Sequence, residues 1–324
     1  MKIYIDAACD VLYASYYIKG FEELKYKIEY NSTYFHMFET NNQFLPIVIQ
    51  SELSFRKVII DFGDGIQIDE KAYNWSDVYY KINIQYGDLL KFSKLTSIGP
   101  SFGVKFDSNF KLLYLSIANY IKAKNRIPNV KLFFSNYKAL MKRLYIQDYN
   151  GGESEKEYVF FISSIWKNEV ITNNFRLNFI KSCIAIFKNN FEGGFAPRSN
   201  GDNLGYDAYV TNSRITLKEY LKNIKKSFVV FNTPAVLHCH GWKMAEYFAL
   251  GKVIISTPIS RELPVKLINN THFLETDGTQ ENIQNIIYKL LNDEKLYGTI
   301  SKESKNYYEN YLSPKAVCTF ISNN

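Results

Sequence analysis

The chain has 324 residues, of which 46% are hydrophobic and 22% charged, with a formal net charge of +7. This composition excludes a disordered protein, and no apolar run approaches the roughly 20 residues that a membrane span needs. The four cysteines are scattered without a CxxC pair, and the first residues lack the apolar body of a signal peptide, so we expect a cytoplasmic protein with reduced thiols.

The first half of the chain alternates strands with helical segments. Strands are expected at Lys2–Ala7, Lys27–Phe35, Leu45–Ile49 and Lys57–Phe62, and a helix is expected at Tyr13–Leu24. This alternation predicts an α/β domain whose parallel sheet is wrapped on both faces, and we place it at residues 1–150. The loop after the first strand contains no glycine, which argues against a dinucleotide-binding fingerprint.

Two aspartates follow expected strands of this half. Asp10 comes after the first strand, and Asp64 lies in the sequence FGDG after Lys57–Phe62. Catalytic groups of α/β sheets tend to lie at the carboxyl ends of strands, so both are candidates for chemistry. The alternative for Asp64 is a turn chosen only for its backbone geometry.

A basic stretch closes the first half. No acidic residue lies between Asp107 and Asp148, whereas eight cations alternate there with apolar side chains. We expect two helices, at residues 109–125 and 129–145, which would bind an anionic membrane surface. The alternative is a pair of ordinary surface helices. Nucleic-acid binding is not expected, because no recognised motif accompanies the charge.

The second half follows a polar, glycine-bearing linker at residues 148–157. Its expected elements form a second α/β domain at residues 151–312, and residues 313–324 form a tail that we expect to pack back on the first domain. In its first strand–helix unit, Tyr158–Ile165 is a strand and Phe175–Lys188 a helix. Lys167 and Arg176 lie in the loop and first turn of that unit, where cations can pair with phosphate. Either can instead be a solvated charge.

The strongest pattern runs from Ser227 to Pro264. Two apolar runs, Phe228–Phe231 and Val253–Ile255, predict buried parallel strands, and Trp242–Leu250 between them has helical spacing. Gly241 precedes this helix and Gly251 follows it. A helix N-terminus that faces the carboxyl ends of parallel strands is a site for anions.

This segment resembles the nucleotide-binding half of GT-B glycosyltransferases, particularly the family-4 type with its Glu-X7-Glu motif. The motif's loop glycine corresponds to Gly241, its second glutamate to Glu246, and its helix-ending glycine to Gly251. The segment Pro258–Pro264, which contains Glu262, stands where the family has a G-G-x-P-E-like loop. The resemblance implies two Rossmann-like domains that face each other across a cleft.

The resemblance also implies roles for the residues of this segment. Glu246 would receive both ribose hydroxyls of a nucleotide sugar, since a carboxylate offers two acceptor oxygens. The amides at Gly241 and Trp242, aided by Lys243, would hold the diphosphate and stabilise it as a leaving group without a metal. The alternative for Glu246 is an ordinary exposed helix residue.

One position departs from the family pattern. The first glutamate of the motif falls on His238, so the stereochemical outcome is not carried over. His240 would donate a hydrogen bond to the donor or leaving group, and a metal site at His238-Cys239-His240 is disfavoured because the set of ligands is incomplete. An inverting enzyme would need a general base, for which Asp64 and Asp10 are the candidates.

The sequence therefore predicts a metal-independent glycosyltransferase. It would move a sugar from a nucleotide diphosphate to a glycan or lipid-linked acceptor held by the first domain, in surface polysaccharide or lipopolysaccharide synthesis at the inner face of a membrane. Two alternatives stay open, a nucleotide-sugar epimerase of the same fold and a catalytically silent binding or scaffold protein.

Overall fold

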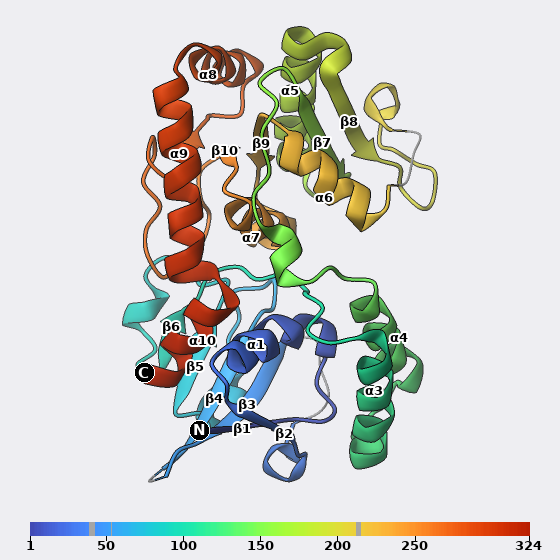
Figure 1. Cartoon of the computed structure of the whole chain (residues 1–324), viewed down its shortest axis with the longest axis vertical. Helices are drawn as coiled ribbons and strands as arrows, with labels where there is room; N and C mark the ends of the chain where they lie inside the picture. The colour runs from blue at the N-terminus through green and yellow to red at the C-terminus, as the bar shows by residue number, and fades with distance from the viewer. Residues whose placement is uncertain (39–42, 53, 212–214) are drawn as a thin grey trace. The chain divides into compact units, whose positions relative to one another are not determined.

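The computed structural model describes residues 1–38, 43–52, 54–211 and 215–324. The chain forms two compact units, each shown in Figure 1. The first unit contains Met1–Asp148, Arg261–Lys266 and Asn310–Asn324, and the second contains Tyr149–Ser260 and Leu267–Glu309. Both are built from strands and helices, so the predicted α/β class with two Rossmann-like units is confirmed.

The first unit is organised around a six-stranded sheet with the order β2-β1-β3-β4-β5-β6. Its strands are β1 (Lys2–Ile5), β2 (Lys27–Tyr30), β3 (Phe44–Gln50), β4 (Phe55–Asp61), β5 (Val78–Lys81) and β6 (Leu95–Ser97). Its helices are α1 (Val11–Glu23), α2 (Glu70–Trp75), α3 (Asn109–Ala123), α4 (Val130–Met141) and α10 (Pro314–Asn323). The two helices predicted in the basic stretch are thus confirmed.

The expectation of an all-parallel sheet is wrong at β3, which runs antiparallel to both β1 and β4. The reason is the short connection after β3, where Gln50 pairs with Phe55. A connection of that length can form only a hairpin, whereas parallel neighbours need a crossover of about a dozen residues or more.

The second unit contains only parallel strand pairs. The strands β11 (Leu274–Glu275), β10 (Val253–Ser256) and β9 (Val229–Asn232) form one sheet, and β7 (Val159–Ser164) pairs with β8 (Phe191–Ala196). The two sheets meet where the amide of Phe228 donates to the carbonyl of Tyr158 at 2.7 Å. The helices are α5 (Val170–Phe187), α6 (Leu217–Lys226), α7 (Trp242–Ala249), α8 (Gln280–Asn292) and α9 (Glu294–Tyr307).

The core of the second unit is aromatic where α5 crosses the strands. The rings of Phe179 in α5 and Phe231 in β9 stack with their centroids 4.6 Å apart, and Phe161 of β7 packs edge-on against Phe179. This packing holds the carboxyl ends of β7 and β9 close together, which positions the loops that follow them.

Short helical turns lie between these helices and strands. They lie at Thr33–Phe35, Asp88–Leu90, Lys124–Arg126, Ile146–Tyr149, Lys188–Asn190, Asp207–Tyr209, Val236–His238 and Tyr308–Leu312. Within the described residues, no helix has the length and apolar character that crossing a bilayer requires.

Candidate functional site

The segment from β9 to β10 folds as its pattern predicts. The chain leaves β9 at Asn232, enters α7 at Trp242 and returns in β10. Gly241 is the N-cap residue of α7 in an extended conformation. Gly251 has φ +61° and ends the helix in the left-handed conformation that glycine adopts without strain.

The loop between β9 and α7 is strained. Leu237 and His238 both have left-handed backbone angles, with φ +56° and +58°. Non-glycine residues take this conformation at a cost, so the surroundings must hold it. The amide of Leu237 donates to a carboxylate oxygen of Glu169 at 3.1 Å, and the hydroxyl of Ser260 donates to the carbonyl of His238 at 2.7 Å. Hydrogen bonds with the segment after β7 and with the segment after β10 therefore stabilise this loop.

A pocket of about 520 Å³ opens beside this loop, and we call it the loop pocket. Its lining residues come from the segments that follow β7, β9 and β10. They are Asn168, Glu169, Val170, Ile171, Thr172, Phe175, Pro234, His238, Thr257, Pro258, Ile259 and Ser260. Since β9 and β10 are parallel neighbours and β7 meets β9, the pocket lies at the carboxyl edge of the sheets, where α/β proteins bind ligands.

The pocket combines apolar walls with one unsatisfied hydroxyl. Val170 and Ile171, in the first turn of α5, are 59% and 69% exposed. The Oγ1 atom of Thr257 is buried and has no hydrogen-bond partner in the part of the chain that the structure describes. An unpaired buried hydroxyl is costly. Because Thr257 is only 2% exposed, its side chain would have to turn toward the pocket before a ligand could bond this hydroxyl.

Among the residues expected at the donor site, His238 lines the pocket and is exposed. Lys167 is also exposed, whereas His240 is buried and Trp242 half-buried. The segment His238-Cys239-His240, considered above as a metal site, is thus divided between an exposed His238 and the buried Cys239 and His240. No group of three or more His, Cys, Asp or Glu side chains is placed to hold a metal ion in the described ranges.

Arg176, Lys243 and Glu246 form a separate group, the charged cluster. Arg176 is 8% exposed, and its guanidinium donates to Thr233 Oγ1 at 3.0 Å and to the carbonyl of Ser164 at 2.8 Å. It therefore ties the loop after β9 to the end of β7. Burial lowers the pKa of Arg176 to about 10.

The ammonium group of Lys243 faces inward and donates to the carbonyl of Ile162. It also lies 5.7 Å from the ring centroid of Phe161. Burial lowers the pKa of Lys243 to about 7, and the nearby Arg176 cation acts in the same direction, while Glu246 opposes it. Lys243 can therefore change charge near neutral pH.

Glu246 is only 5% exposed, so the alternative of an exposed helix glutamate is wrong. The hydroxyls of Tyr149 and Tyr220 each lie 3.4 Å from its carboxylate oxygens. Bonds of this length are weak, so another hydroxyl can replace them.

The remaining predicted residues belong to the first unit. The amide of Glu262 donates to the carbonyl of Ile84 at 3.0 Å. Asp10 caps α1 and accepts from the amides of Leu12 at 3.0 Å and Tyr13 at 3.4 Å. Burial raises the pKa of Asp10. Asp64 is exposed after β4.

Sequence reasoning identified His238 and the segment Pro258–Pro264 but missed the part of the lining between β7 and the middle of α5. Asn168, Thr172 and Thr257 carry no motif, and they meet only because their loops follow neighbouring strands. The expected helix began at Phe175, whereas α5 begins at Val170. Val170 and Ile171, two large apolar residues shortly before the expected start, were a usable signal.

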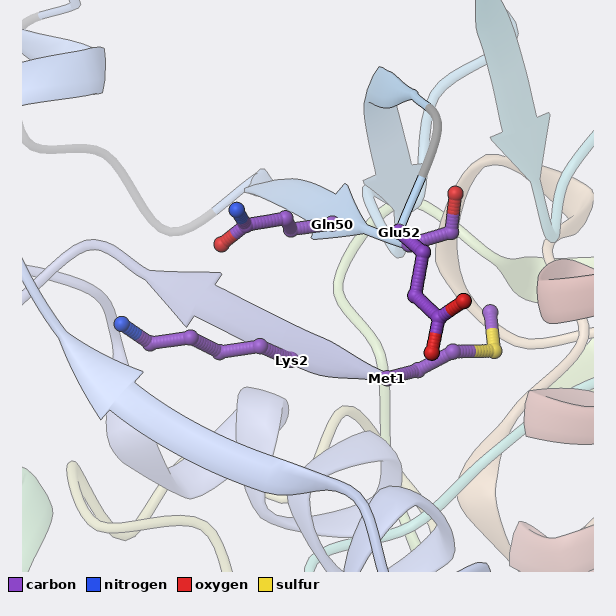
Figure 2. A pocket seen from close by; sticks show the side chains of 5 residues that line it. Met1, Lys2, Gln50 and Glu52 are labelled. Carbon is purple, nitrogen blue, oxygen red and sulfur yellow. The ribbon is translucent and has the colours of Figure 1, made fainter.

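A second pocket, of about 640 Å³, lies in the first unit (Figure 2). It is lined by Met1 and by Lys2 at the start of β1, together with Gln50 at the end of β3 and the following Ser51 and Glu52. Lys2 is paired with Glu29 at 2.6 Å. The pocket lies at the amino end of β1, the edge opposite to the one where α/β sheets bind ligands. We assign it no role.

Comparison with known proteins gives structural likeness alone. No protein-family model matches the chain, and no curated protein matches it. Among solved structures, the chain is similar to HepE of Anabaena in complex with UDP, at 13% identity and a TM-score of 0.41, covering 78% of this chain and 79% of that one.

Two further solved structures show likeness of the same degree. Sucrose-phosphate synthase of Thermosynechococcus elongatus has 12% identity and a TM-score of 0.45, with 81% of this chain and 65% of that chain covered. MnaA of S. aureus with UDP has 9% identity and a TM-score of 0.43, with 97% and 92% covered. All three TM-scores lie below 0.5, so the function proposed below rests on this chain's own residues.

Proposed function

We propose that the chain is a glycosyltransferase whose second unit binds a nucleotide-diphosphate sugar. The loop pocket carries this proposal, because it is formed by the segments after β7, β9 and β10 at the carboxyl edge of parallel strands. A glycan or lipid-linked acceptor would be bound by the first unit. No metal is assigned to the reaction.

The lining of the loop pocket suits a nucleoside. Val170, Ile171 and Phe175 supply apolar surface for a flat base, while Thr257 Oγ1 supplies a hydrogen-bonding group that lacks a partner in the described chain. Ligand pockets typically combine such walls with a few fixed polar groups. His238 lines the same pocket and is the proposed contact to the sugar.

The diphosphate would be held by the charged cluster and the start of α7. Arg176 and Lys243 are two neighbouring cations, with Glu246 close to Lys243 and Glu169 close to Arg176. Lys243 would turn from the carbonyl of Ile162 toward the anion, which would raise its pKa and keep it charged. Together with the amides at Gly241 and Trp242, and with His240, it would stabilise the leaving diphosphate.

Glu246 is the proposed partner of the ribose hydroxyls. Its carboxylate is held by the weak contacts to Tyr149 and Tyr220, and a ribose diol would take their place with shorter bonds. Lys167 would contact a phosphate from the loop after β7. Glu262 belongs to the first unit, so it has no part in this proposed site.

The first experiment is a thermal-shift panel of nucleoside diphosphates and nucleotide sugars, followed by calorimetry with the best ligand. We expect one nucleotide class to raise the melting temperature. Glu246→Ala should then weaken binding by about 1.5 to 3 kcal/mol, as for the loss of a charged hydrogen-bond partner. An unshifted panel would favour a scaffold protein instead.

A second variant separates binding from folding. Thr257→Val removes the unpartnered hydroxyl and keeps the shape, so it should leave the melting temperature unchanged or raise it. Nucleotide affinity should fall about fivefold to tenfold if the ligand uses this group. Thr299→Val, on the exposed side of α9, is the matched control. Equal affinity in both variants would remove the loop pocket from the proposal.

A further inference from the structure

Helix α3 presents its apolar side to solvent. Its exposed residues are Phe110 at 80%, Leu113 at 51%, Tyr114 at 71%, Ile117 at 49% and Ile121 at 66%, and we call them the α3 face. Their spacing of three and four residues places them along one side of the helix. Soluble proteins rarely leave such a continuous apolar stripe uncovered, and one that persists marks an interaction surface.

The inward side of α3 is partly polar. Ser116 and Asn119 are buried, together with Leu112 and Ala123. Asn119 donates from its amide to the hydroxyl of Tyr137 in α4 at 3.0 Å, and the hydroxyl of Ser116 donates to the carbonyl of Leu113 at 2.7 Å. The bond of Asn119 joins α3 to α4 and so supports this orientation, whereas the bond of Ser116 lies within α3. The usual arrangement of an amphipathic surface helix is therefore inverted.

Helix α4 continues the surface. It packs against α3 through Tyr120 and Phe134, whose ring centroids are 5.3 Å apart, and both helices are visible together in Figure 1. At the start of α4, Val130 and Leu132 are each 41% exposed. The apolar surface thus extends over two helices of the first unit.

Positively charged side chains lie in the same stretch of the chain as this apolar surface. The exposed lysines of the stretch are Lys111, Lys122, Lys124, Lys131, Lys138 and Lys142. Four of the predicted cations have partners in the first unit. Arg126 pairs with Asp6 at 2.8 Å and Lys111 with Asp107 at 3.3 Å, while Arg143 and Lys122 donate to the carbonyls of Gly103 and Tyr30. The sequence contains no further carboxylate between Asp107 and Asp148.

We propose that the α3 face, with the start of α4 and the exposed lysines, docks on an anionic lipid bilayer. Phe110, Ile117 and Ile121 would enter the boundary between headgroups and acyl chains, while the lysines would contact lipid phosphates. A second copy of the chain fits less well, since a twofold contact through this surface would bring its like charges together. A nucleic acid would leave the apolar stripe uncovered.

The test is flotation of the full chain with vesicles of phosphatidylcholine alone and of phosphatidylcholine mixed with phosphatidylglycerol. We expect binding to the anionic vesicles, weak binding to the neutral ones, and release by salt. The apolar variant Phe110→Ser, Ile117→Ser, Ile121→Ser and the charge variant Lys124→Ser, Lys131→Ser, Lys138→Ser should each lose at least about tenfold in affinity.

The control variant changes three exposed apolar residues of the second unit, Ile184→Ser, Ile268→Ser and Tyr288→Ser. It should bind like the unchanged protein. All variants should keep their circular dichroism, because every altered side chain is exposed.

Three results would overturn the proposal. They are unchanged vesicle binding in the apolar variant, equal loss in the control variant, and absence of binding by the unchanged protein. A dimer in light scattering that the apolar variant converts to a monomer would instead assign the surface to self-association. The experiment needs neither nucleotide nor acceptor, so its outcome is independent of the proposed activity.

Discussion

The hydroxyl of Ser260 donates a hydrogen bond of 2.7 Å to the backbone carbonyl of His238. The bond joins the loop after β10 to the strained turn after β9, and both residues line the loop pocket. Because His238 has a left-handed backbone that it would not adopt freely, this contact helps to fix the pocket wall. The geometry of the proposed donor site thus depends on a bond between two loops.

Removal of this bond should weaken nucleotide binding. Ser260→Ala should lower the affinity about fivefold, equivalent to about 1 kcal/mol for one hydrogen bond, and calorimetry with the ligand from the thermal-shift panel measures it. Ser301→Ala is the control, since its hydroxyl makes a bond of the same length to the carbonyl of Gly251. If both variants bind equally well, the loop contact has no part in ligand binding.

Asp10 has two separable roles in the first unit, a cap for α1 and a proposed general base. Asp10→Asn should keep the melting temperature, because Asn caps a helix as well as Asp, whereas Asp10→Ala should lose about 1 kcal/mol of stability. Burial raises the pKa of Asp10, which favours proton uptake. We therefore expect Asp10→Asn to lower kcat for sugar transfer about 100-fold or more.

The exposed Asp64 provides the comparison for this experiment. Asp64 is the other candidate base, but its exposed side chain is less suited than the buried Asp10 to a site that excludes water. If Asp10 is the base, Asp64→Asn should transfer sugar at nearly the unchanged rate, and a loss of kcat in Asp64→Asn alone would assign the role to Asp64. If Asp10→Asn keeps the kcat of the unchanged protein, Asp10 is not the general base. A retaining transfer needs no such base and would then account for the activity.

The sequence predicts those parts of the fold whose signals are local. The strand at Phe228–Phe231 and the glycine cap at Gly251 follow from an apolar run and from the conformational freedom of one residue, and both are confirmed. The orientation of α3 could not be predicted, because it depends on the bond between Asn119 and a tyrosine of another helix. The pocket was missed for a similar reason, since its residues meet only through strand order.

A close contact holds the C-terminal helix in the first unit. A side chain at Gly20 of α1 would overlap the carbonyl of Pro314 and the sulfur of Cys318 in α10. Gly20→Ala should therefore destabilise the protein by about 1 to 3 kcal/mol, as overpacking does. Thermal unfolding measures this change.

The matched control for this substitution is Gly298→Ala in α9. Apart from its chain neighbours and the adjoining backbone of its own helix, no atom of the described chain lies within 4 Å of a Cβ placed there. Alanine in an open helical position should stabilise the protein by about 0.5 to 1 kcal/mol. A rise in melting temperature for both variants would show that α10 does not press on α1 at Gly20.

Lys252 makes stability depend on pH. Lys252 is 2% exposed, and burial lowers its pKa to about 7. Its ammonium group donates to Ser154 Oγ at 2.6 Å and to the carbonyl of Lys225 at 3.0 Å. Above about pH 7 the unfolded chain keeps a proton that the folded chain has lost, so the free energy of unfolding rises with pH, by up to about 1.4 kcal/mol per unit.

Lys252→Met should remove this contribution. Urea unfolding is compared between about pH 7 and pH 8.5. Unfolded thiols begin to ionise there while burial raises the pKa of Cys183 and Cys318 in the folded protein. This contribution is common to the variant and the unchanged protein, so it cancels in the difference between their slopes. Met cannot donate these two hydrogen bonds, so the free energy of unfolding falls by the same amount at every pH. The protonation of Lys252 is therefore measured only by the slope of this free energy against pH. Lys289→Met, at an exposed lysine of α8, should keep the wild-type slope. An unchanged slope in Lys252→Met would show that Lys252 stays charged in the folded protein.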